Sequence, residues 1–120
     1  MKVKVKITQS FKKQAKPLLK KYFSLSDELI QLENKLKNNP RLGIALGHEV
    51  YKIRLAVKSK GKGKSGGLRI ISYLKMDIIV EIEKVEEMIS VNLLAIYDKS
   101  ETSTITGSEI VNLIRKINPY

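Results

Sequence analysis

The chain has 120 residues, of which 23 are Lys or Arg and 12 are Asp or Glu, and its formal net charge is +11. It contains no cysteine, which excludes disulfides, thiolate nucleophiles and cysteine-ligated zinc. No apolar run approaches the roughly 20 residues of a membrane-spanning helix. The length predicts a single domain over residues 1–120, and the absence of a signal-peptide pattern at the N-terminus predicts a cytoplasmic protein.

Charge is distributed unevenly along the chain. Residues 1–60 carry 15 basic and 4 acidic side chains, whereas residues 61–120 carry 8 of each. Between Val50 and Met76 there are eight Lys or Arg and no acid, and Asp77–Glu87 then holds five acids and one lysine. Such segregation indicates a polyanionic partner such as nucleic acid. A lysine-rich surface that only keeps the protein soluble is the alternative.

The N-terminal residues predict a strand followed by a helix. Met1–Ile7 alternates lysines with Val and Ile, which is typical of an edge strand with one solvated face. Thr8 or Ser10 can cap the helix that follows. Pro17 lies inside the helical pattern, so we expect a kink or two shorter helices there. The predicted apolar stripe consists of Phe11, Ala15, Leu18, Leu19 and Tyr22.

The remaining elements predict an α+β domain. A second helix is expected to begin at Ser26 and to end before Pro40, which gives a helical hairpin. A final helix follows the capping box at residues 106–109. The intervening strands are expected to pair as an antiparallel meander. The fold class is therefore an N-terminal strand and helical hairpin packed on a small, mainly antiparallel sheet, with a C-terminal helix. The predicted strands are Val50–Lys58, Leu68–Leu74, Ile78–Ile82 and Val91–Tyr97.

The glycine-rich stretch GKGKSGG at residues 61–67 contains the Gly-Lys-Ser of a nucleotide-binding P-loop. A P-loop would need a glycine where Lys58 stands and a helix where the predicted strand Leu68–Leu74 begins, so this reading is rejected. We predict instead a cationic loop that contacts RNA phosphates. Its alternative is a solvated hairpin loop. The predicted RNA-binding residues are Lys58, Lys60, Lys62 and Lys64.

The strand before this loop gathers cations on one face. Its two-residue period places Lys52, Arg54 and Lys58 together, while the apolar residues between them face the helices. Arg69 lies on the next strand, which the loop brings alongside. We therefore expect three or four cations to converge on the open face of the sheet, where an anion would relieve their mutual repulsion.

Three segments together resemble a known family. They are VYKIRL at residues 50–55, GKGKSGGLRII at residues 61–71 and LLAIYDKSE at residues 93–101. Their order and spacing resemble the RelE/ParE superfamily of toxins, and most closely the HigB-like branch of RelE toxins from bacterial type II toxin–antitoxin systems. The resemblance covers nearly the whole chain.

This resemblance implies a ribosome-dependent mRNA endonuclease that works without metal or cofactor and is neutralised by a cognate antitoxin protein. By position, Lys52, Arg54, Arg69 and Lys99 match the family's catalytic cations. Arg54 and Arg69 would hold the phosphate oxygens, and Lys52 or Lys99 would transfer protons. The tyrosine often found downstream in RelE toxins would align near residue 105, which is isoleucine here; Tyr97 could replace it if it faces the cleft.

Two other functions remain open from the sequence. A ParE-like inhibitor of DNA gyrase would share the fold without needing the cationic face. An RNA-binding protein of this fold without catalysis would keep the cations. The acids Glu81, Glu83, Glu86 and Glu87 are interpreted as a solvated hairpin rather than a metal site, and His48 as a surface or boundary residue.

Overall fold

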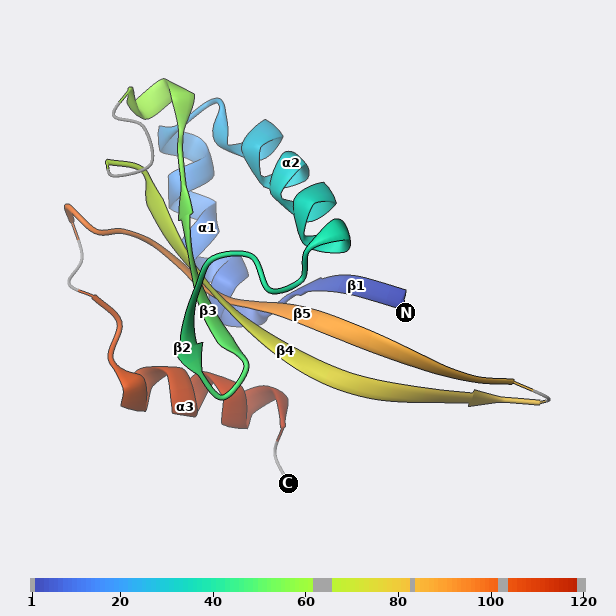
Figure 1. Cartoon of the computed structure of the whole chain (residues 1–120). Helices are drawn as coiled ribbons and strands as arrows, with labels where there is room; N and C mark the ends of the chain where they lie inside the picture. The colour runs from blue at the N-terminus through green and yellow to red at the C-terminus, as the bar shows by residue number, and fades with distance from the viewer. Residues whose placement is uncertain (1, 62–65, 83, 102–103, 119–120) are drawn as a thin grey trace.

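The computed structural model describes residues 2–61, 66–82, 84–101 and 104–118. A five-stranded sheet in the order β1-β5-β4-β3-β2 forms the centre, with β1 parallel to β5 and all other neighbours antiparallel (Figure 1). The α+β fold class and the antiparallel meander are confirmed. The elements are β1 (Lys2–Ile7), α1 (Gln9–Lys21), α2 (Leu25–Asn38), β2 (Ile44–Gly47), β3 (Val50–Leu55), a 3-10 turn (Lys58–Lys60), β4 (Leu68–Glu81), β5 (Lys84–Asp98) and α3 (Gly107–Ile117).

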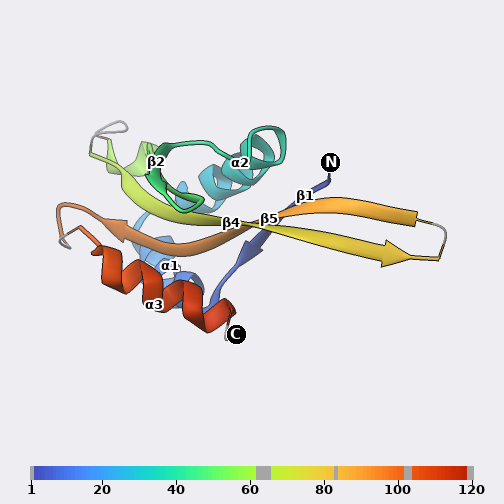
Figure 2. The ribbon, with the colours of Figure 1, turned by 60° about the horizontal axis from the view of Figure 1, so that its bottom comes forward.

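Helices cover both faces of the central part of the sheet. On one face α1 and α2 bury the larger core, which includes Phe11, Leu32 and Ile70. On the other face α3 packs through Ile110 against a smaller core that contains Tyr97. Figure 2 shows α3 on the opposite side of the sheet from α2. None of the described helices is both long and apolar enough to cross a membrane.

The capping residues predicted for the first and last helices are confirmed. The Thr8 hydroxyl accepts a hydrogen bond from the Phe11 backbone N–H at 3.3 Å, and Thr106 accepts one from Glu109 at 3.2 Å. The helix α1 runs unbroken through Pro17, so it does not divide into two pieces. Buried side chains on both sides of the proline hold the helix against the sheet, and this packing outweighs the missing backbone hydrogen bond.

The strands differ from the prediction in length. Residues 68–74 and 78–81, predicted in two separate strands, belong to the single strand β4, and Ile82 lies in the turn that follows it. Residues 91–97 lie in the inner half of β5. Acidic residues in the outer parts of β4 and β5 interrupt the apolar pattern of the sequence. They do not interrupt the ladder of backbone hydrogen bonds, which continues to the pair Glu81–Lys84. We call the outer part of this hairpin, residues 75–87, the arm. It projects away from the helices (Figures 1 and 2).

The short strand β2 was not predicted, because its four exposed residues carry little strand signal. It joins β3 through a two-residue turn in which His48 and Glu49 have φ of 54° and 62°. Positive φ at both central positions gives the twist that a tight hairpin requires, although residues other than glycine adopt it with strain.

Candidate nucleic-acid interface

Two of the predicted site residues, Arg54 and Arg69, lie in one row across the sheet with Tyr97. Arg54 on β3 is the register partner of Arg69 on β4, and Arg69 is the partner of Tyr97 on β5. Directly opposed residues project from the same face of a sheet. Lys52, two residues before Arg54, projects from that face as well. The sheet therefore brings Lys52, Arg54 and Arg69 together, as predicted from the strand period.

The positive charge that is exposed to solvent on this face comes from side chains of β3. Arg54 is exposed and Lys52 is half-buried, and neither forms an ion pair with any described residue. Like charges directly opposite each other on neighbouring strands destabilise a sheet, and Arg54 faces Arg69 in this way. A bound anion would remove that repulsion, so the row favours a negatively charged ligand.

Arg69 occupies a different environment from the one expected of a phosphate contact. Its side chain is only 4% exposed, and its guanidinium donates a hydrogen bond to the carbonyl of Leu68 at 3.4 Å. Its positive charge also acts on the neighbouring Tyr97 hydroxyl. Arg69 thus supplies positive charge from beneath the surface, whereas Arg54 presents its charge to solvent.

Tyr97 faces the cleft, which is the condition under which it could replace the family's tyrosine. Together with Lys52 and residues of α3 it lines a cavity of about 440 Å³. Burial raises the pKa of the Tyr97 hydroxyl, although a hydrogen bond with the backbone of Ile105 and the charge of Arg69 act in the opposite direction. At neutral pH the phenol is therefore protonated and can donate a hydrogen bond or a proton.

The helix α3 makes this face less open than predicted. The cavity beside Lys52 is walled by Ile110 and Ile114 of α3, and by His48 in the β2–β3 turn. The predicted helix was correctly placed in the sequence after its capping box. The sequence of residues 99–106 carries no periodic pattern that would specify the position of α3 over the cationic face.

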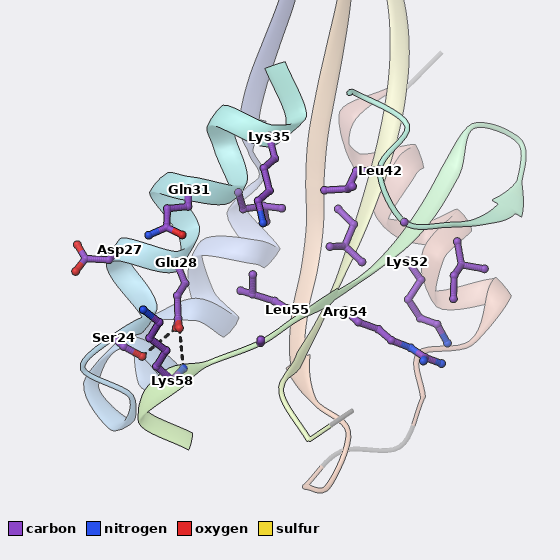
Figure 3. Close-up of a pocket in the computed structure, with 15 residues that line it drawn as sticks. Ser24, Asp27, Glu28, Gln31, Lys35, Leu42, Lys52, Arg54, Leu55 and Lys58 are labelled. Atoms are coloured by element: carbon purple, nitrogen blue, oxygen red, sulfur yellow. Dashed lines mark hydrogen bonds between the residues drawn. The ribbon is translucent and has the colours of Figure 1, made fainter. Parts of the chain in front are cut away.

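A second cavity, of about 580 Å³, lies between α2 and β3 (Figure 3). Its α2 wall carries the acids Asp27 and Glu28, and the Lys58 backbone N–H donates to Glu28 at 2.7 Å. Figure 3 shows Lys52 and Arg54 extending away from α2, whereas Lys58 lies beside Glu28. The structure therefore separates Lys58 from the row, although the strand period placed it on the same face. The turn that begins at Lys58 ends the alternation.

Lys60 is an anchor rather than a solvated cation of the loop. It is paired with the carboxylate of Asp98 at 3.3 Å, and the side chains are 10% and 3% exposed. Asp98 also accepts hydrogen bonds from Tyr22 at 3.1 Å and from the Ser100 hydroxyl at 2.7 Å. Burial alone would raise the pKa of Asp98, but these hydrogen bonds outweigh it and hold the pKa below its usual range. The cluster fixes the start of the loop to the end of β5.

The other predicted cations lie apart from the row. Lys62 and Lys64 fall outside the described residues. Lys99 is exposed in the turn that follows β5, and it lines neither of the two cavities described above. The candidate interface therefore consists of Lys52, Arg54, Arg69 and Tyr97. Lys52 and Arg54 were predicted from strand alternation, Arg69 from its place on the neighbouring strand, and Tyr97 only as a conditional substitute.

No family model matches the chain.

Proposed function

We propose that the protein is the toxin of a type II toxin–antitoxin pair and acts as a ribosome-dependent endonuclease on mRNA. The observation that carries this proposal is the row formed by Arg54, Arg69 and Tyr97 beside Lys52. The site combines the positive charges of Arg54 and Lys52 with a protonated phenol on one face of the sheet. Such a site can bind a phosphodiester and exchange protons with it.

The proposed chemistry needs only these side chains. The RNA 2′-hydroxyl attacks the adjacent phosphorus, the bond from phosphorus to the 5′-oxygen breaks, and a cyclic phosphate forms. Arg54 binds the phosphate oxygens on which negative charge grows, which is typically worth about 3 kcal/mol for one such contact. Lys52 relays the proton of the 2′-hydroxyl to water, and the Tyr97 phenol donates a proton to the departing 5′-oxygen. Arg69 strengthens the positive field from below.

The cognate antitoxin is proposed to act on the same face. An acidic protein segment would either cover Lys52 and Arg54 or displace α3, which packs on this face through a small apolar core. Hydrogen exchange on the complex tests this. Protection or exposure should change at β3 and α3, whereas changes confined to α1 and α2 would contradict it.

Induced expression in bacteria, followed by sequencing of RNA 5′ ends, tests the enzymatic proposal. We expect new ends inside translated messages that disappear when translation is blocked. Arg54→Ala should remove them, whereas Lys13→Ala, which deletes an exposed charge on α1, should not. Growth arrest with intact messages would instead indicate another target such as DNA gyrase.

The burial of Arg69 favours a second candidate function, in which the protein binds RNA without cleaving it. Only Arg54 and Lys52 then contact phosphate. Two cations suffice for binding RNA, but they stabilise the charge of the transition state less than three would. This candidate predicts that the protein retards RNA in a gel-shift assay. It also predicts that the RNA remains intact on prolonged incubation with the protein and ribosomes.

A further inference from the structure

The arm presents an unpaired backbone edge. On the side of β4 away from β5, the described part of β3 pairs only with residues 68–73, and the last bond on this side runs from the Leu74 N–H to the Glu49 carbonyl at 2.9 Å. Backbone groups alternate in direction along a strand, so those of Met76, Ile78 and Val80 point outward as those of Leu74 do. A bare edge of this kind is a template for another strand.

The arm also carries an uncovered apolar face. Met76, Ile78 and Val80 on β4 are 53%, 68% and 74% exposed, and Val85 on β5 is 69% exposed. This face continues the one that α1 and α2 cover in the body of the protein, where Leu74 is buried in the larger core. A two-stranded hairpin is only marginally stable in water without further packing. The arm therefore has the properties of a surface that is covered by a partner.

We propose that this partner is a second copy of the chain, which pairs with the arm as an antiparallel strand, β4 against β4. The sequence of the edge, KMDIIVE at residues 75–81, is complementary to itself in that direction. With the two-fold axis at Ile78, Met76 stands opposite Val80 of the second copy, and Lys75 stands opposite Glu81. Apolar residues then meet across the axis, and opposite charges meet at both ends.

Other arrangements of two arms are less favourable. Packing them face to face would bury Glu87, which is the register partner of Ile78 and projects from the same apolar face. The free edge of β5 is shorter, because the described part of β1 pairs with β5 from Met88 onward and leaves residues 84–87 beyond it. Nucleic acid is not the expected partner, since the arm carries five acids and only two lysines between residues 75 and 87.

A cysteine at the proposed axis tests the register. The chain has no native cysteine, so single-cysteine variants give unambiguous products. In the proposed pairing the two Ile78 residues exchange backbone hydrogen bonds, with Cα atoms roughly 5.5 Å apart, which a disulfide can span. Ile78→Cys should therefore form a covalent dimer under mild oxidation. Val85→Cys, on the same face but one strand further from the axis, and Ile30→Cys, on α2, should not.

Solution mass tests whether the native chain uses this edge. Light scattering of the full chain should give twice the chain mass, and Ile78→Lys should return it to one chain mass, because like charges would meet on the axis. Ile30→Lys, which alters a comparably exposed isoleucine, should leave the dimer intact. A monomer at all concentrations overturns the proposal. So does a dimer that both lysine variants leave unchanged, or one that cross-links equally through Val85→Cys and Ile78→Cys.

Discussion

The two halves of β4 place the same residue type in opposite environments. Ile70 in the inner half is fully buried, whereas Ile78 in the outer half is 68% exposed. Both lie on a continuous ladder with β5, so backbone pairing is the same and only the neighbouring elements differ. Helices cover the inner half on both faces and leave the arm bare. Burial along this strand is thus decided by what packs on the sheet and not by the strand itself.

The largest expected effect distinguishes the two halves by stability. Ile70→Ala should lower the free energy of unfolding by about 4 kcal/mol, because it leaves a cavity in the larger core. Ile78→Ala should change the free energy of unfolding of the monomer by less than about 0.5 kcal/mol, as for other exposed positions. Chemical denaturation at low protein concentration measures both. Equal losses of free energy of unfolding in the two variants would mean that Ile78 in the arm is packed as tightly as Ile70 in the core.

A slightly smaller effect is expected from the buried cluster that anchors the loop. Asp98→Asn leaves Lys60 buried without its counter-charge and should cost about 3 kcal/mol of stability. The pKa of Asp98 is lowered in the folded protein, so its stabilising contribution is present above the usual aspartate pKa of about 3.9. That contribution is lost as the pH falls through the lower, folded-state pKa.

Denaturation of the wild-type protein and of Asp98→Asn from pH 7 down to acid checks this dependence. The difference in stability between the two proteins should shrink as Asp98 becomes protonated. An acid of the arm serves as control: Glu87→Gln alters an exposed carboxylate and should leave the pH dependence almost unchanged. If the difference in the free energy of unfolding between wild type and Asp98→Asn stayed constant across the acid range, Asp98 would not be the source of the pH dependence.

Removing charge from the inner half should reduce activity with little effect on folding. Arg54→Ala should slow RNA cleavage by about 100-fold, the loss expected when one contact to developing charge is deleted. Its stability should stay within about 0.5 kcal/mol of wild type, because Arg54 is exposed. In the arm, Lys84→Ala deletes a cation that is paired with Glu86 and should leave cleavage unchanged. A comparable loss in both variants would assign the effect to net charge.

Features governed by neighbouring residues were predictable from the sequence. The caps at Thr8 and Thr106 depend on side chains three positions away, and the shared face of Lys52 and Arg54 depends only on strand alternation. The pairing of Lys60 with Asp98 was not predictable in this way, since it joins positions 38 residues apart in sequence through a turn that bends the chain.

The burial of Arg69 and the exposure of the arm were missed for the same physical reason. The alternation of residues in a strand predicts which residues share a face of the sheet. It does not predict which helix packs on that face, because this depends on connecting segments whose sequences have no periodic pattern. The hairpin predicted at the acidic residues is present, since β4 and β5 pair out to Glu81 and Lys84, but its length depends on backbone pairing that no side-chain pattern specifies. Contacts between residues far apart in the sequence therefore account for the differences between the predicted arrangement of the candidate site and its arrangement in the structure.

The smallest expected effect concerns the salt dependence of RNA binding. Each phosphate contact to single-stranded RNA contributes about 0.7 to the slope of log affinity against log salt. Lys52→Ala should lower the slope by about that amount, because the half-buried Lys52 lies beside the cationic row on the same face of the sheet. Lys75→Ala, at the base of the arm, deletes the same charge outside the row and should leave the slope unchanged. Filter binding over a salt series distinguishes them, and an equal change in both variants would mean that RNA follows total charge rather than the cationic face.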